Sequence, residues 1–223
     1  MDDFKFQIEN TDGLTHSGEL TFHNGKQIKT PVCWFGLSVI EPKEFQKKVF
    51  LDSNVQAILS NAYDLYYNDT KDERLTLIKE LQELDIKHKM DSGGFQLMKK
   101  RMNGKADKFP LDVKMVLDKQ LEVGCEVGVQ LDFPFGPKLS KHEKIKRMNE
   151  TLENLEKLIK LIDKYDVDFS ILPVIHTVSD NLDLLKHGLS KMEDILGHLP
   201  KIIGIGSLVP LVKTVKGSRK YRI

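Results

Sequence analysis

Cysteine is scarce in this chain of 223 residues, where it occurs only as Cys33 and Cys125. Both residues lie in short apolar runs, which is the usual setting of a small buried thiol. The chain has no Cys-x-x-Cys pair and no closely spaced group of histidine and cysteine, which argues against a structural zinc site within it. Two isolated thiols indicate a reducing compartment.

Long apolar runs and an excess of charge are missing too. No apolar run approaches the roughly 20 residues of a membrane-spanning helix, and residues 1–5 lack the pattern of a signal peptide. We therefore expect a cytoplasmic protein with no membrane partner. The 34 basic and 33 acidic side chains give a net charge of +1. Attraction to a nucleic acid would therefore have to come from local basic clusters.

What is present is the composition of an ordinary globular protein, with 40% apolar and 30% charged residues. The chain is long enough to bury a sizeable core, and one α/β domain is the simplest arrangement. Residues 1–30 contain short alternating segments separated by the turn signals Thr11-Asp12-Gly13 and Asn24-Gly25. They predict a small antiparallel flap ahead of the main domain, which we place at residues 31–223.

From Thr30 onward, short apolar runs alternate with stretches whose apolar residues recur three and four positions apart, which is the pattern of alternating strands and helices. The strands are continuous apolar runs, as expected where both faces of a sheet are buried. We expect strands near residues 32–37, 57–60, 87–90, 127–132, 170–175 and 202–205, and helices near 42–48, 72–84, 111–123, 141–165 and 180–196.

Periodicity leaves two architectures open, a doubly wound open sheet and most of an eight-stranded barrel. The candidate functional groups follow the carboxyl ends of the strands, where barrel enzymes have their active sites, and this favours the barrel. No glycine-rich fingerprint follows the first strand, which weakens the dinucleotide-binding alternative. The prediction is therefore an α/β fold of the TIM-type (β/α)8 kind, incomplete, with about six strands present.

The strongest local signal is the segment Asp91-Ser92-Gly93-Gly94-Phe95-Gln96, which directly follows a predicted strand. Two adjacent glycines allow the backbone to approach a ligand and to aim amide groups at it. The carboxylate of Asp91 is available to an N–H donor or for proton transfer. The same spacing also fits a tight turn in which Asp91 only caps the backbone.

Further candidates follow the later strands. Asp132, in Leu131-Asp132-Phe133-Pro134, places a second carboxylate at the same rim. An ionised Asp only accepts hydrogen bonds, so two such groups suit the N–H edge of a purine-like base, although a capping or ion-paired Asp132 is the alternative. His176 would point into the same mouth, but a lone histidine is more often structural. Small residues in 204–208 would expose backbone amides to a flat ligand.

Together these segments resemble the tRNA-guanine transglycosylase family over nearly the whole chain. The segment 91–96 is the most specific match. The other matching segments are Thr11-Asp12-Gly13, Gly18-Glu19-Leu20-Thr21, His23-Asn24-Gly25, Ile28-Lys29-Thr30-Pro31 and 58–65. Residues 203–211 are closer to the archaeal and DNA-modifying branches of the family than to its bacterial queuosine enzymes.

The resemblance implies a pentosyltransferase that exchanges guanine in tRNA for a 7-deazaguanine such as a preQ0-like base. The reaction would be a double displacement at the ribose C1′, as in a retaining glycosidase. Asp91 would be the catalytic residue that recognises the base and exchanges protons with it, Phe95 would stack on the base, and Asp132 would bind its pyrimidine-ring edge. The other residues implied to bind the base are Ser92, His176, Gly206, Ser207 and Leu208.

The chain departs from the family pattern in two ways. His176-Thr177-Val178 stands where the family usually has Gln followed by two glycines, which leaves the identity of the incoming base open. The nucleophilic Asp and the zinc-binding cysteines of the family follow later strands than the sixth, so we expect a chain truncated before its last strands and no cofactor or metal site within it. The same exchange on DNA, and a non-catalytic binding subunit whose partner supplies the nucleophile, remain alternatives. The chain could form a homodimer or a heterodimer under each of these alternatives.

Basic side chains cluster after the predicted strand ends. The clusters are Lys99, Lys100 and Arg101 with Lys105 and Lys108, then residues 138–147, and finally residues 213–222. They favour a polynucleotide partner, tRNA or DNA, with Lys99, Lys100 and Arg101 as predicted contacts. Simple solvation of surface helices is the alternative.

Overall fold

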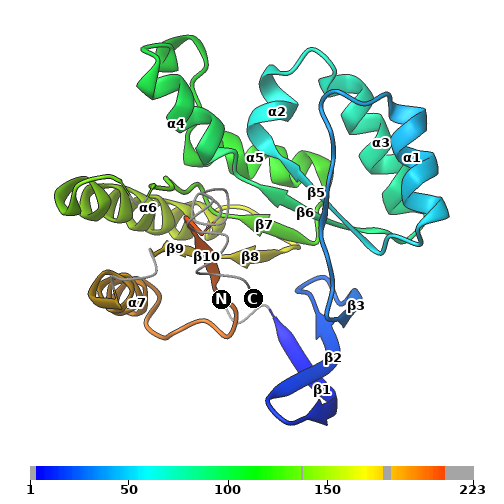
Figure 1. The fold of residues 1–223 in the computed structure, drawn as a ribbon, viewed down its shortest axis with the longest axis horizontal. Coiled ribbons are helices and arrows are strands. Elements are labelled where there is room, and N and C mark those ends of the chain that lie inside the picture. The colour runs from blue at the N-terminus through cyan, green and yellow to red at the C-terminus, as the bar shows by residue number, and fades with distance from the viewer. Residues whose placement is uncertain (1–3, 137, 178–181, 209–223) are drawn as a thin grey trace.

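The computed structural model describes residues 4–136, 138–177 and 182–208, and begins with a three-stranded antiparallel sheet in the order β1-β2-β3 (Figure 1). The strands are β1 (Lys5–Asp12), β2 (Thr15–Thr21) and β3 (Gln27–Thr30). Gly13, with φ +58°, lies in the connection between β1 and β2, a conformation that glycine adopts without strain. The antiparallel strands expected near the N-terminus are therefore present and longer than the pattern indicated.

A five-stranded parallel sheet follows, in the order β4-β5-β6-β7-β8. These strands are β4 (Phe35–Gly36), β5 (Ala57–Asn61), β6 (Lys87–Asp91), β7 (Val127–Val129) and β8 (Ser170–Leu172). Pro173, which has no N–H for a ladder, separates β8 from β9 (Val174–His176), and β9 pairs in parallel with β10 (Gly204–Gly206). Strands that are consecutive in the chain are thus neighbours in space, and the fold is α/β with a parallel sheet.

Helices connect the parallel strands. They are α1 (Lys43–Asp52), α2 (Ala62–Tyr67), α3 (Lys71–Glu83), α4 (Gly94–Met102), α5 (Val113–Val123), α6 (Lys141–Ile162) and α7 (Leu182–Leu196), with a 3-10 turn at Ala106–Lys108. Side-chain oxygens of Asn61, Asp112 and Ser140 cap α2, α5 and α6 by accepting from backbone amides of the first turn. None of the helices in the described ranges is long and apolar enough to cross a membrane.

The main core lies between the parallel sheet and helices α2, α3 and α5. Its largest contributions come from aliphatic side chains of the strands and of α3 and α5, and burial of each stabilises the fold by about 1.5–3 kcal/mol. Fully buried members include Ile58, Met90, Leu77, Ile78, Leu81 and Leu117. A second cluster, which includes Phe135, Met148, Leu155 and Ile175, packs α6 and α7 against β9.

The antiparallel sheet packs against the amino ends of the parallel strands. Phe22 and Ile28 share a cluster with Ala57 and Val127, the first residues of β5 and β7. The backbone N–H of His23 also donates to Ser170 Oγ at 2.8 Å. The carboxyl ends of the parallel strands, where the candidate residues lie, therefore face away from the antiparallel sheet.

Three strand predictions need correction. The strand expected at residues 32–37 is only Phe35–Gly36, and the one expected at 170–175 is interrupted at Pro173. The strand expected at 127–132 ends at Val129, because the Gln130 side chain bonds to the Val174 amide and the Thr151 carbonyl in place of a regular ladder. The predicted start of a helix at residue 180 lies outside the described residues.

Candidate functional site

Four segments that are distant in sequence meet beyond the carboxyl ends of β6, β7, β9 and β10. Ser92, after β6, donates through Oγ to Asp132 Oδ1 at 2.9 Å. The second oxygen of Asp132, Oδ2, lies 3.2 Å from His176 Nε2 at the end of β9. His176 Nδ1 in turn lies 3.1 Å from Ser207 Oγ after β10. The structure therefore brings Ser92, Asp132, His176 and Ser207 into one connected group.

The two glycines after β6 let this loop pack against its neighbours. Gly93 has φ +82°, and a Cβ there would lie 2.4 Å from Tyr63 Cβ. A Cβ on Gly94 would lie 1.8 Å from the backbone oxygen of Asp132. The Gly93 amide donates to Asp91 Oδ2 at 3.4 Å and the Gly94 amide to Ser92 Oγ at 3.2 Å. Both amides thus donate to side chains of the same loop. Asp91 accepts one of these hydrogen bonds, as the tight-turn interpretation expected.

Asp91 has an unusual proton affinity. Burial, followed by the nearby charge of Asp132, raises the pKa of Asp91 to about 7, against the opposing effects of the Gly93 and Ser92 amides and of Lys89. A carboxyl group with a pKa near neutrality can give or take a proton at physiological pH. The Asp91 carboxyl is therefore suited to exchange a proton with a neighbouring group.

His176 is enclosed by the protein. It is 0% exposed, and the ring of Phe135 packs edge-on against it at a centroid distance of 5.4 Å. A Cβ on Gly206 would lie 2.3 Å from His176 Nδ1, so only glycine fits beside the ring. Although Nε2 lies within ion-pair distance of Asp132, the angles do not make a hydrogen bond. His176 was expected to point into an open mouth; in this conformation it contacts Asp132 instead.

The remaining predicted base contacts differ in accessibility. Phe95, on the first turn of α4, is 44% exposed, so a face of its ring is available for stacking. Leu208 is exposed, Gly206 is half-buried at the end of β10, and Ser207 is buried with φ +67°. Among these predicted contacts, Phe95 and Leu208 are therefore the side chains that solvent reaches most readily.

The predicted nucleic-acid contacts all lie in the last turn of α4, and each cation stacks on an aromatic ring. Lys99 Nζ lies 4.4 Å from the ring centre of Phe95, and Lys100 Nζ lies 4.3 Å from that of Phe109. The Arg101 guanidinium lies 4.3 Å from the ring centre of Phe133 and 3.5 Å from Glu150. The basic cluster at 213–222 lies outside the described residues.

Sequence reasoning missed Lys89. It lies two residues before Asp91 on β6, so the two side chains leave the same face of the strand. Burial lowers the pKa of Lys89, and the charge of Asp91 opposes this effect. Lys89 Nζ also lies 4.9 Å from the ring centre of Trp34. The alternation of the strand was the signal that could have found it. Asn61, at the end of β5, caps α2.

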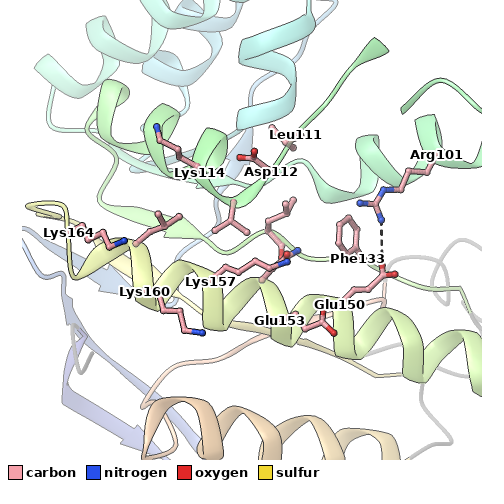
Figure 2. A pocket seen from close by; sticks show the side chains of 14 residues that line it. Arg101, Leu111, Asp112, Lys114, Phe133, Glu150, Glu153, Lys157, Lys160 and Lys164 are labelled. Atoms are coloured by element: carbon pink, nitrogen blue, oxygen red, sulfur yellow. Dashed lines mark hydrogen bonds and ion pairs between the residues drawn. The ribbon is translucent and has the colours of Figure 1, made fainter. Parts of the chain in front are cut away.

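The surface cavities lie apart from this group. The groove in Figure 2, with a volume of about 550 Å³, runs between α5 and α6 and is bordered by Lys114, Lys157, Lys160 and Lys164. Arg101, Phe133 and Glu150 form one end of it, and the dashed line marks the contact of Arg101 with Glu150. Within the described ranges, no group of three or more His, Cys, Asp or Glu side chains is placed to hold a metal ion.

Comparison with known proteins gives a consistent picture. The profile of the queuine tRNA-ribosyltransferase family matches residues 12–213. A tRNA-guanine(15) transglycosylase of Methanococcus maripaludis (strain C6 / ATCC BAA-1332) is 29% identical over 215 residues, which are 93% of this chain and 31% of the relative. The protein of the same name from Thermococcus kodakarensis is 27% identical over 223 residues, 97% of this chain and 35% of the relative. The chain thus spans about a third of the length of these curated relatives.

Proposed function

Since the chain belongs to the queuine tRNA-ribosyltransferase family, we propose that it contains the base-binding site of an enzyme that exchanges guanine in tRNA for a 7-deazaguanine. The observation that carries the proposal is the placement of two carboxyl groups beyond paired strands, Asp91 at the end of β6 and Asp132 in the loop after β7, where the charge of Asp132 acts on Asp91. Membership of the family makes a pentosyltransferase the expected reaction class. The identity of the base and the activity of the chain are parts of the proposal.

The carboxyl pair fits one edge of guanine. Guanine and its 7-deaza analogues present N–H donors at N1 and at the exocyclic amino group, and an ionised carboxylate is purely an acceptor. Adenine presents a bare acceptor nitrogen at N1, which would face a carboxylate unfavourably. Asp132 would therefore hold the pyrimidine-ring edge, Phe95 would stack on the ring, and Asp91 would exchange a proton with the base.

The strand order supports a barrel as the framework of this site. The succession β4, β5, β6, β7, β8 with β9, and β10 runs from neighbour to neighbour without reversal, as the strands of a (β/α) barrel do. We propose that these strands form part of such a barrel. In the double displacement an aspartate attacks the ribose C1′, guanine departs, and the new base attacks in turn. We assign Asp91 to proton exchange with the base. We do not assign the attack on the ribose C1′ to any of the described carboxylates.

The proposed polymer follows from the names of the relatives and from the basic side chains of α4. Names of the relatives favour tRNA over DNA, and Lys99, Lys100 and Arg101 would contact its backbone. We place the enzyme in the cytoplasm, where tRNA is modified, and leave open whether it acts as a dimer. Exchange on DNA, and a non-catalytic binding subunit, are alternative outcomes of the experiments.

The proposal is tested by equilibrium binding of a panel of bases to the purified chain. Guanine and preQ0 should bind, and adenine should bind at least about tenfold more weakly, the equivalent of roughly one lost charge-assisted hydrogen bond. Unmodified tRNA and single-stranded DNA of equal length would then compete for labelled chain. Equal binding of adenine and guanine would contradict the base assignment, and preference for DNA would contradict the tRNA assignment.

A further inference from the structure

A chain of polar contacts leads from β10 to the carboxyl pair. The Phe135 amide donates to Ser207 Oγ at 2.8 Å, and Ser207 Oγ lies 3.1 Å from His176 Nδ1. His176 Nε2 then lies 3.2 Å from Asp132 Oδ2, and the other oxygen of Asp132 accepts from Ser92 Oγ. Phe135, Ser207, His176 and Ser92 are all buried, so water does not compete at these positions.

The contact between Ser207 Oγ and His176 Nδ1 admits either direction of donation, because a hydroxyl has one proton and two lone pairs. Ser207 Oγ accepts the Phe135 amide and retains one proton of its own, which can be donated to His176 Nδ1. A neutral imidazole whose Nδ1 accepts a hydrogen bond carries its proton on Nε2. In that tautomer Nε2–H lies 3.2 Å from Asp132 Oδ2, an electrostatic contact whose angles do not make a hydrogen bond in this conformation, while Ser92 Oγ donates to Oδ1.

We propose that Ser207 is a positioning residue which donates to His176 Nδ1, fixes the Nε2–H tautomer of His176 and so turns that N–H toward Asp132, whose other oxygen accepts from Ser92. This inference rests on the proposed function, because it assigns roles within the same base site. Ser207 and His176 are both buried in this conformation, and the proposed role is one that they exert through Asp132.

Two features of the backbone indicate that the Ser207 hydroxyl is needed for its contact with His176. Ser207 has φ +67°, a conformation that is uncommon for residues other than glycine and asparagine. Gly206, beside it, leaves no room for a side chain against His176 Nδ1. A glycine at position 207 would fit this backbone with less strain, so the serine provides a contact that backbone geometry alone does not require.

The test is the tautomer of His176, read from the ring nitrogen shifts of protein labelled with 15N-histidine. The signal is identified by its loss in His176→Asn. We expect Nε2–H in the unaltered chain at neutral pH, and a mixture of tautomers in Ser207→Gly, a variant that removes the hydroxyl and suits the positive φ. The affinity for preQ0 should fall about fivefold in Ser207→Gly, as for the loss of one hydrogen bond.

The outcomes separate the inference from the proposed function. The unaltered chain could instead show an Nδ1–H tautomer, or a charged His176 ring at neutral pH. Either result would overturn the proposed role of Ser207, whether or not a base binds. An unchanged tautomer and unchanged preQ0 affinity in folded Ser207→Gly would overturn the role of Ser207. Failure of preQ0 to bind any variant, with the expected tautomers present, would contradict the proposed function and leave the proton assignment standing.

Discussion

Asp91 is the residue whose ionisation is most strongly coupled to folding. Its pKa rises from 3.8 to about 7 because of burial and the charge of Asp132, so the folded chain holds this proton more tightly than the unfolded chain. The contribution of Asp91 to stability is therefore greatest below about pH 4 and declines as the pH rises through 7. At neutral pH the Asp91 carboxyl is partly ionised, so it stabilises the fold less than it does at acid pH.

We predict that Asp91→Asn loses this pH dependence. Relative to the unaltered chain, the free energy of unfolding of the variant should increase by at least about 1.4 kcal/mol between about pH 4.5 and about pH 8, the equivalent of one pKa unit. Urea unfolding at the two pH values measures it, and other titrating groups cancel in the difference. Asp118→Asn, at a surface ion pair with Lys114, is the matched control. A difference that is constant with pH would refute the coupling.

Gly94 determines how closely the loops after β6 and β7 can approach. In Gly94→Ala the new Cβ would overlap the backbone oxygen of Asp132, which cannot move without displacing that loop. We predict a loss of more than about 2 kcal/mol in unfolding free energy, as for overpacking against backbone. In Gly36→Ala, where nothing lies within 4 Å, the change should be small. Equal melting temperatures for the two variants would contradict the proposed close approach.

Among the elements, the antiparallel sheet is held to the parallel sheet by a buried charge. Glu126, whose side chain is 1% exposed, accepts from Lys26 Nζ at 2.5 Å and from the His88 amide at 2.6 Å. Lys26 lies in the connection between β2 and β3 and is 46% exposed. Removal of the lysine would leave a buried carboxylate with a single backbone donor, which is costly in a poorly solvated position.

We predict that Lys26→Met destabilises the chain by about 1–3 kcal/mol and that Glu126→Gln added to it recovers part of the loss. Lys29→Met provides the control, because Lys29 pairs with Glu9 and Glu19 at the surface, where such pairs contribute less than about 1 kcal/mol. Chemical denaturation of the four proteins measures both effects. Equal losses in the two lysine variants would show that burial of Glu126 does not matter.

The helices and strands with clear periodicity were predictable from sequence, and the exceptions have local causes. Helices α2 and α4 were missed because they are short and begin directly at the ends of β5 and β6, where a loop was expected. The end of β7 was misplaced because the Gln130 side chain substitutes for a strand partner. The Gln130 contacts join residues 21 and 44 positions apart in sequence, which periodicity does not record.

For the molecule as a whole, sequence reasoning identified the site residues more readily than their arrangement. Asp91 and Asp132 stood out because each follows a buried strand. The enclosure of His176 could not be anticipated, because it depends on Gly206 and Ser207 of β10 and the loop after it approaching the ring. Lys89 was overlooked because a single lysine between His88 and Met90 carries no motif. Tertiary contacts between strand ends thus define the site.

The most direct test of the central claim is calorimetric titration of preQ0 into the unaltered chain, Asp91→Asn and Asp132→Asn, with Asp118→Asn as the control. Each of the two site variants should bind preQ0 more weakly by over about 1.5 kcal/mol, because each removes a charge-assisted contact in a poorly solvated site, while the control binds normally. Unchanged affinity in both Asp91→Asn and Asp132→Asn, with all four proteins folded, would contradict the assignment of the carboxyl pair as the base-binding site.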